Sequence, residues 1–274
     1  MTRRTIVITG ASDGIGAAAA RRLRRQGAHV VVVGRSADKT SAIAAELAAD
    51  SFVADFAELA QVRGLAQCLR SAYPRIDVLA NNAGGMTSNR QLTADGFEKT
   101  YQVNYLAPFL LTTQLLDLLV DSGATVINTS SAMHRLLRKV GIEDLQPTRS
   151  YSPSKAYALS KLAVILFSTE LHRRYHHQGV SAVAFHPGYV NSNFGPASGS
   201  RFLRVMKRTP AALVIPGADR GADQLVWLAS SRAGIDWRSG GYYSRHRIAK
   251  PNPRAADPAL ARELWERSLA TTSS

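Results

Sequence analysis

Short runs of β-branched residues alternate with longer segments of helical period along most of this chain. The strand-like runs are Thr5–Thr9, His29–Val33, Ser51–Ala54, Ile76–Ala80, Thr125–Thr129 and Val180–Phe185. Several are almost entirely apolar, as expected for strands that helices cover on both faces. Alternating strands and helices require a parallel sheet joined by right-handed crossovers. The sequence therefore predicts an α/β fold: a doubly wound parallel sheet with helices on both faces.

Segments with a helical period lie between these runs. They are Ile15–Gln26, Ala37–Ala49, Leu59–Ala72, about 95–120 and Pro153–His177. In the first of them, Ile15, Ala19 and Leu23 share one face, and Gly27 stands where a glycine commonly ends a helix. The pattern predicts amphipathic helices that pack against the sheet.

No repeat or linker divides the chain, so we expect a single domain over residues 1–274. A stretch rich in Gly, Pro and Ser interrupts the alternation at residues 195–217, and we expect a flap over the substrate there. The tail after Lys250 is rich in Pro and Ala. It contains a last predicted amphipathic helix near Pro258–Leu269.

Composition narrows the functional classes. No apolar run approaches the roughly 20 residues of a membrane span, and the first residues do not resemble a signal peptide. Cys68 is the only cysteine, and no Cys/His cluster suggests a metal site. We therefore expect a cytoplasmic protein that holds no metal. Its 34 Lys and Arg against 20 Asp and Glu give a net charge of +14, which favours an anionic partner such as a nucleotide phosphate, a membrane surface or nucleic acid.

A glycine-rich turn, Thr9–Gly16, joins the first strand to the first helix. Glycine permits positive φ and close approach of a phosphate, and the helix N-terminus presents free N–H groups to the anion. Any strand-to-helix turn favours glycine, but this one opens a βαβ unit, which predicts a dinucleotide site. The residues assigned to it are Gly10, Ser12, Asp13, Gly14, Ile15 and Gly16.

The end of the second strand bears on which dinucleotide binds. An NAD site usually has a carboxylate there, and an NADP site has a cation for the 2′-phosphate. This chain has Arg35 and Ser36 and no acid. NADP(H) is therefore the preferred cofactor, with NAD(H) as the alternative, because Asp13 places negative charge in the loop and Arg35 is otherwise a solvated surface residue.

Polar and small residues also follow the third and fourth strands. Asp55 and Phe56 come after the third, where a carboxylate can accept from an adenine amino group, and Asn82, Ala83 and Gly84 come after the fourth. Asx and Gly residues favour turns in any protein. Their place at carboxyl ends of strands, where open α/β sheets bind ligands, favours contacts with the cofactor.

Tyr157 and Lys161 lie four residues apart, on one face of the predicted helix over Pro153–His177. A free tyrosine has a pKa of about 10 and is a poor base near neutrality. A nearby Lys⁺ and a positive nicotinamide favour the phenolate, so this pair is predicted to transfer a proton.

The same spacing occurs at Tyr151 and Lys155. Pro153 argues against this second pair, because proline is comfortable at the first helical position and disruptive deeper in a helix. Ser152 is then the predicted N-cap and Tyr151 lies outside the helix. We therefore assign proton transfer to Tyr157 and Lys161.

Two further polar positions accompany the pair. Ser130 and Ser131 follow the fifth strand, and either hydroxyl could bind a substrate carbonyl or simply cap the next segment. Asn104 falls inside a predicted helix, where asparagine is a poor former. That local cost indicates either a functional role or a side chain that faces solvent.

Taken in order, these motifs resemble the short-chain dehydrogenase/reductase family over about residues 5–245. The motifs are Thr9–Gly16, Asn81–Gly84, Asn104, the serine pair with Tyr157–Lys161, and Pro187–Ser192. The resemblance implies a Rossmann-like single domain with a seven-stranded sheet, and a homodimer or homotetramer.

The resemblance also implies a catalytic tetrad of Asn104, Ser131, Tyr157 and Lys161. Ser131 matches the family's serine, Lys161 would also hold the nicotinamide ribose, and Asn104 would tether a water in the proton relay. The cofactor contacts that it implies in the last motif are Pro187, Gly188, Val190 and Ser192.

Within the family the chain is most similar to the retinol-dehydrogenase-like branch, through Ser130–His134 and Tyr157–Ala163. This implies an NADP(H)-dependent oxidoreductase that interconverts a carbonyl and an alcohol on a small apolar molecule, with Tyr157 as general acid and base. The alternative is a non-enzymatic NADP-sensing or nucleic-acid-binding protein that uses its basic surface, although no nucleic-acid-binding motif is found. Peripheral membrane contact through Arg201–Arg208 is a further, less favoured reading.

Overall fold

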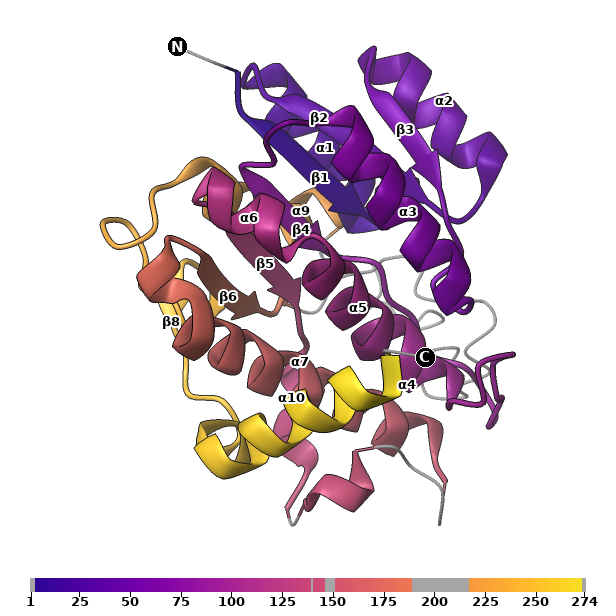
Figure 1. The fold of residues 1–274 in the computed structure, drawn as a ribbon, viewed down its shortest axis with the longest axis vertical. Coiled ribbons are helices and arrows are strands. Elements are labelled where there is room, and N and C mark those ends of the chain that lie inside the picture. The colour runs from indigo at the N-terminus through magenta and orange to yellow at the C-terminus, as the bar shows by residue number, and fades with distance from the viewer. Residues whose placement is uncertain (1–2, 139, 146–150, 189–216, 273–274) are drawn as a thin grey trace.

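One sheet forms the centre of the computed structural model, which describes residues 3–138, 140–145, 151–188 and 217–272 (Figure 1). Its strand order is β3-β2-β1-β4-β5-β6-β7-β8. The strands are β1 (Thr5–Thr9), β2 (His29–Gly34), β3 (Asp50–Val53), β4 (Val78–Asn81), β5 (Thr125–Thr129), β6 (Ser181–Phe185), β7 (Tyr242–Ser244) and β8 (Arg247–Ile248). All neighbours pair in parallel except β7 and β8, which are antiparallel. The predicted α/β class is confirmed.

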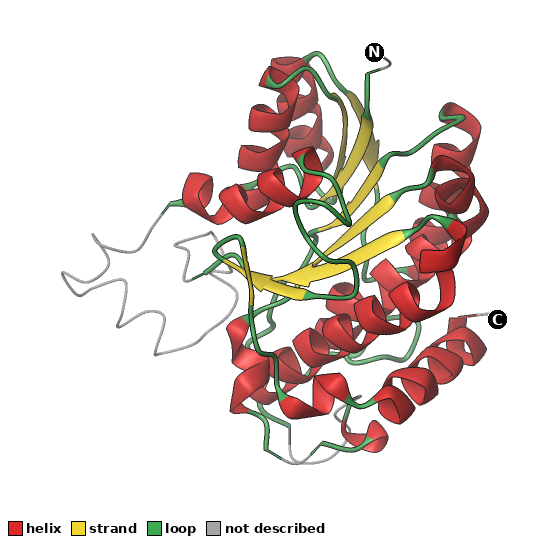
Figure 2. Ribbon diagram, turned by 90° about the vertical axis from the view of Figure 1, so that its left-hand side faces the viewer, coloured by secondary structure: helices red, strands yellow, loops and turns green. Residues whose placement is uncertain are grey.

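Helices cover both faces of the sheet (Figure 2). The α-helices are α1 (Gly14–Arg25), α2 (Ala37–Leu47), α3 (Leu59–Ala72), α4 (Lys99–Tyr101), α5 (Ala107–Gln114), α6 (Leu116–Ser122), α7 (Pro153–Tyr175), α9 (Ala218–Ser230) and α10 (Pro258–Thr272). Shorter turns are η1 (Gln102–Leu106), η2 (Ala132–Leu136), η3 (Ile142–Asp144), η4 (His176–Gln178) and η7 (Pro253–Ala256). One apolar core joins α3, α5, α7 and α10 to the sheet, and a second joins α1 and α9 to its other face.

The long helix predicted near residues 95–120 is broken in the structure. It consists of α4, the π-helical turn η1, α5 and α6. Pro108 explains the π turn, because proline has no N–H to donate to the carbonyl four residues earlier, which belongs to Asn104. Within the described residues no single helix is long and apolar enough to cross a bilayer; residues 99–114 and 116–122 reach that length only together, with a 65° bend.

The chain after Lys250 folds back onto the core. The predicted final helix is confirmed as α10, which packs on α7. Trp265 of α10 is buried against the rings of Phe109 and Phe167, with centroids 5.1 and 5.9 Å away. The expected flap at 195–217 lies outside the described residues except for Gly217, and Val190 and Ser192 lie outside them as well.

Candidate active site

The glycine-rich turn and the loop after β4 are held together by hydrogen bonds. Asn82 Nδ2 donates to the carbonyl oxygens of Thr9 and Gly10 at 3.0 and 3.4 Å. The backbone N–H groups of Asn82 and Ala83 both donate to Thr9 Oγ1 at 3.0 Å. Gly10 has φ +66° and packs against Ala83 so closely that a Cβ would lie 2.8 Å from Ala83 Cα. The turn is therefore a rigid backbone cradle at the N-terminus of α1, which suits a phosphate group.

The charge in this turn is balanced by a residue that the sequence analysis missed. Asp13 caps α1 by accepting from Gly14 N at 2.8 Å, and Lys39 Nζ lies 2.9 Å from its other carboxylate oxygen. Ser36 caps α2 and Arg35 is exposed beside it. Three groups suited to an anion thus follow β2, and the negative charge of Asp13 is offset. Lys39 lies three residues after Ser36, the N-cap of α2, so the spacing of a helix could have indicated that the two residues lie close together.

The two residues assigned after β3 differ in their surroundings. Asp55 Oδ1 accepts from Ala57 N at 2.9 Å and stays partly exposed. Phe56 is buried in the core, and its carbonyl accepts from Gln102 Nε2 at 3.3 Å. Asp55 is thus available to a ligand, while the Phe56 side chain belongs to the packing that supports the loop.

The hydroxyl groups of the two serines after β5 have different partners. Ser130 Oγ is buried and donates to the Lys161 carbonyl oxygen at 2.8 Å. Ser131 is the one that hydrogen-bonds to the Tyr157 hydroxyl, and its Oγ also accepts from Met133 N at 3.3 Å. This agrees with the choice of Ser131 as the catalytic serine.

Lys161 lies beside Tyr157, as the spacing predicts. Its Nζ is 5.6 Å from the centroid of the Tyr157 ring and donates to the Thr129 carbonyl oxygen at 2.9 Å. A Cβ added to Gly84 would lie 3.3 Å from the same Nζ. Because an ammonium carries three donors, the bond to Thr129 leaves Lys161 able to bind other groups.

Burial sets the charge of both groups. It raises the pKa of Tyr157 to about 12, an effect that the hydrogen bond to Ser131 partly offsets. Burial also lowers the pKa of Lys161 to about 7. Among the protein's own groups the direction for Tyr157 is upward, because the loss of solvent outweighs the hydrogen bond to Ser131; the lowering predicted beside a positive nicotinamide stays a prediction.

Asn104 is nearly buried and does not face solvent. Its Nδ2 donates to the Gly85 carbonyl oxygen at 2.9 Å and to Ser160 Oγ at 3.0 Å, and its Oδ1 accepts from Gly85 N at 2.7 Å. The side-chain amide is thus occupied by protein groups and joins the Gly84–Gly85 loop to α7. The side chain therefore positions the loop, and the predicted water at Asn104 stays a prediction.

The rejected pair is arranged as expected. Ser152 Oγ caps α7 by accepting from Lys155 N at 3.2 Å, Pro153 is the first helical residue, and Tyr151 lies outside the helix. The Tyr151 hydroxyl contacts Thr87 Oγ1 at 3.2 Å and Glu98 Oε1 at 3.3 Å. Tyr151 therefore belongs to a separate polar cluster.

The turn η2, which follows Ser131, is anchored by the C-terminal segment. Asn252 is buried, and its Nδ2 donates to the carbonyl oxygens of His134 at 3.1 Å and Leu137 at 2.7 Å. Within the turn, His134 Nδ1 hydrogen-bonds to the Ser131 carbonyl oxygen. Asn252 thus supports the segment that presents Ser131.

We expect Asn252→Ala to lower the free energy of unfolding by about 1–3 kcal/mol, because it removes the side-chain donor from two carbonyl oxygens, and that of His134 keeps only the bond from Leu137 N. Urea unfolding measures this loss. Asn252→Asp is the matched control: it keeps the oxygen that accepts from Arg254 N but removes both donors, so it should destabilise at least as much. An Asp variant as stable as the parent would contradict the assigned role.

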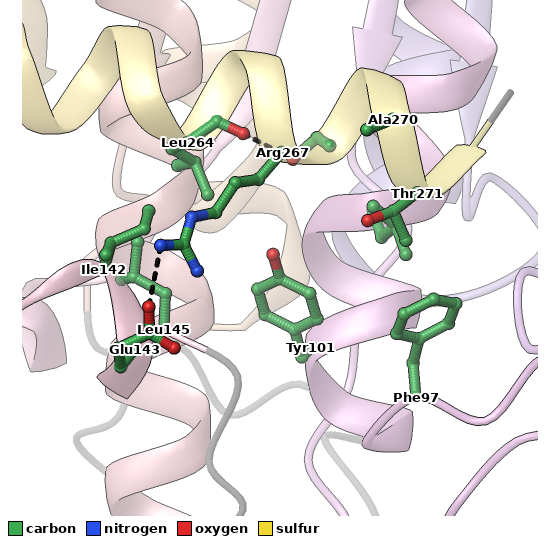
Figure 3. A pocket seen from close by; sticks show the side chains of 11 residues that line it. Phe97, Tyr101, Ile142, Glu143, Leu145, Leu264, Arg267, Ala270 and Thr271 are labelled. Atoms are coloured by element: carbon green, nitrogen blue, oxygen red, sulfur yellow. Dashed lines mark hydrogen bonds and ion pairs between the residues drawn. The ribbon is translucent and has the colours of Figure 1, made fainter.

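A pocket of about 440 Å³ lies elsewhere, where α10 passes α4 and η3 (Figure 3). Tyr101 points its hydroxyl toward it, and Arg267 pairs with Glu143 across it at 2.7 Å. None of its lining residues is among those predicted for the site. In the part of the chain that the structure describes, no group of three His, Cys, Asp or Glu side chains is placed to hold a metal.

Part of the positive charge lies in a run of arginines on α1, and two of them form ion pairs within the protein. Arg21 pairs with Glu46 at 2.6 Å and Arg22 with Asp223 at 2.9 Å. These pairs join α1 to α2 and α9. Arg201–Arg208, the segment considered for membrane contact, lies outside the described residues.

Comparison with known proteins identifies the family. The family model for short chain dehydrogenases matches residues 4–200. The chain belongs to the short-chain dehydrogenase/reductase family. A candidate daunorubicin C-13 ketoreductase of Streptomyces sp. (strain C5) is 44% identical to it over 97% of this chain and 92% of that protein. Human retinol dehydrogenase 13 is 34% identical over 97% of this chain and 83% of its own length.

A solved structure is also similar to this short-chain dehydrogenase/reductase. It is a short chain dehydrogenase of Burkholderia cenocepacia in complex with NADP, with a TM-score of 0.64 and 27% identity over 83% of this chain and 90% of that one. The chain is thus an oxidoreductase of this family, of the retinol-dehydrogenase-like branch, as the sequence motifs predicted.

Proposed function

We propose that this oxidoreductase reduces a ketone or aldehyde on a small apolar molecule with NADPH, and catalyses the reverse reaction with NADP⁺. The observation that carries the proposal is the hydrogen bond between Ser131 and Tyr157 with Lys161 Nζ 5.6 Å from the phenol ring centroid. Conversion of carbonyl compounds to alcohols, followed through NADPH absorbance over a panel of aldehydes and ketones, tests it. Absence of turnover across the panel would overturn it.

Each residue of the site has a separate role in the proposed reduction. Bound NADPH supplies the hydride that the carbonyl carbon receives. Tyr157 is protonated at neutral pH, since its pKa is about 12, and donates its hydroxyl proton to the carbonyl oxygen. The Ser131 hydroxyl donates a hydrogen bond to the same oxygen and orients it. Lys161, when protonated, returns a proton toward Tyr157 and stabilises the phenolate.

The cradle at the start of α1 fits a dinucleotide. Gly10, Gly14 and Gly16 would hold the pyrophosphate through backbone N–H groups, with Asn82 and Ala83 bracing the turn. Arg35, Ser36 and Lys39 would hold a 2′-phosphate. The NADP complex of a related dehydrogenase supports this cofactor.

Lys39→Met is expected to weaken use of NADPH. It removes a cation near the 2′-phosphate together with the Lys39–Asp13 ion pair, so kcat/KM for NADPH should fall by about tenfold or more while kcat/KM for NADH changes little. Steady-state kinetics with both cofactors measures the ratio. Asp13→Asn in the Lys39→Met background should recover part of the loss, and equal losses with both cofactors would contradict the assignment.

The pH profile should differ between the two directions. Lys161 is protonated below its pKa of about 7 and neutral above it. Carbonyl reduction should therefore lose kcat/KM as pH rises through 7, whereas alcohol oxidation, which needs the Tyr157 phenolate, should gain with pH. Lys161→Arg keeps its charge, so any residual reductase activity should decline only at a higher pH. A reduction profile that is flat through this range would contradict this role for Lys161.

The homo-oligomer and the cytoplasmic location remain predictions from the sequence. Light scattering coupled to gel filtration measures the first, and fractionation of the source cells measures the second.

A further inference from the structure

Two buried side chains near Tyr157 carry polar atoms that the protein leaves unpaired. His134, in η2, is fully buried, and Tyr242, at the start of β7, is 3% exposed. Neither His134 Nε2 nor Tyr242 Oη has a hydrogen-bond partner among the described residues. Native proteins rarely leave such atoms unpaired, since burial without a partner is costly. Their position therefore needs an explanation.

Both side chains adjoin the catalytic residues. His134 is tied to Ser131 through the bond from Nδ1 to the Ser131 carbonyl oxygen. Its ring meets the Tyr242 ring edge to face, with centroids 5.0 Å apart. Burial raises the pKa of Tyr242, and Tyr157 is close enough to add to that rise. The two side chains thus belong to the cluster of packed residues that contains Ser131 and Tyr157.

The two atoms have complementary chemistry. A carbonyl oxygen only accepts, so Nδ1 of His134 must carry the proton in its bond to Ser131. Burial lowers the pKa of His134, which keeps the ring neutral and leaves Nε2 as an acceptor. The Tyr242 phenol stays protonated and is a donor. An acceptor beside a donor matches a hydroxyl group, which both donates and accepts, better than it matches a second carbonyl or a carboxylate.

We propose that His134 Nε2 and Tyr242 Oη bind a hydroxyl group of the substrate, and that the preferred substrates are hydroxyketones, with the spacing between hydroxyl and reacting carbonyl left to the test. The inference rests on the proposed function, because it takes the carbonyl to be held by Ser131 and Tyr157. The substrate hydroxyl donates to His134 and accepts from Tyr242. A ketone without the hydroxyl leaves both buried atoms unpaired.

Matched ketones test this directly. The probes are acetophenone, 2-hydroxyacetophenone and 2-methoxyacetophenone, with propiophenone and its 3-hydroxy derivative for the longer spacing. Wild-type kcat/KM with NADPH should favour a hydroxyketone over its parent by at least about tenfold, and the methoxy compound should lose this gain because it cannot donate to His134.

Two variants assign the preference to the proposed atoms. Tyr242→Phe should lower the hydroxyketone-to-ketone ratio by about five- to tenfold, the effect of one lost hydrogen bond. His134→Asn keeps a donor toward the Ser131 carbonyl and removes Nε2, so it should lower the same ratio. Tyr243→Phe is the matched control: this neighbouring tyrosine packs in the other core and its hydroxyl accepts from Arg238 N at 2.8 Å, so the ratio should not change.

A binding measurement separates this inference from the proposed activity. Calorimetry titrates 2-hydroxyacetophenone and acetophenone into Tyr157→Phe and into the Tyr157→Phe, Tyr242→Phe double variant, each with NADPH. If the enzyme reduces ketones but does not prefer the hydroxyketones, the inference is overturned and the proposed activity stands. The same holds if it prefers them and Tyr242→Phe leaves that preference intact. No turnover, but tighter hydroxyketone binding that depends on Tyr242, upholds the hydroxyl site and overturns the proposed activity. Neither turnover nor selective binding overturns both.

Discussion

Tyr157→Phe should lower kcat for carbonyl reduction by at least about 10³-fold, within the range that a positioned general acid supplies. The substitution removes only the hydroxyl that hydrogen-bonds to Ser131, and it keeps a ring of the same size in a fully packed position of α7. The fold and the cofactor cradle at α1 should be unaffected. Turnover measured with saturating NADPH, together with the Kd for NADPH from fluorescence titration, checks both halves of the expectation.

The chain supplies its own control for this experiment. Tyr151 and Lys155 repeat the spacing of the catalytic pair, but Tyr151 lies outside α7 and contacts Thr87 and Glu98. Tyr151→Phe should therefore keep kcat within about twofold, since it loses only partly exposed hydrogen bonds. Normal turnover in the Tyr157→Phe variant would mean that another group donates the proton. If turnover were lost in Tyr151→Phe instead, Tyr151 would be the donor.

The parts of the fold that depend on apolar periodicity could be predicted from the sequence. Strands β1 and β5 and helix α3 have the predicted limits, because buried β-branched runs and amphipathic helices carry their pattern locally. β7 and β8 were missed because they are short and pair only at the edge of an existing sheet. The resemblance to the family implied a seven-stranded sheet, and the sheet has an eighth strand, β8, at its edge. The broken helix at 95–120 was missed although Pro108 marked the place.

The candidate site shows a similar division. Spacing and proline chemistry predicted that Tyr157 lies within α7 and Tyr151 before it, as the structure has them, because the N-cap of α7 is a local property. Lys39 and His134 were missed because their roles depend on neighbours distant in sequence or on burial. The burial that raises the pKa of Tyr157 could not be predicted for the same reason: the sequence shows which charges are nearby but not how little water reaches them.

Gly16→Ala is expected to weaken NADPH binding by at least about 100-fold, since the cradle leaves no room for a side chain. A Cβ at this position would lie 2.2 Å from the Gly10 carbonyl oxygen and 2.7 Å from Asn82 Nδ2. Gly10 cannot withdraw, because it is packed against Ala83 with φ +66°. The turn must therefore widen, which moves the N–H groups that would face the pyrophosphate.

Gly85→Ala distinguishes this effect from a general sensitivity of the site to added bulk. Gly85 lies in the same region and exchanges hydrogen bonds with Asn104 through its backbone, yet a Cβ there would meet nothing within 4 Å. Its Kd for NADPH should stay within about threefold of the parent, because no backbone group has to move. Equal binding by the Gly16 and Gly85 variants would mean that the cradle yields, and that the phosphate contacts do not depend on the close packing of Gly10, Gly16 and Asn82.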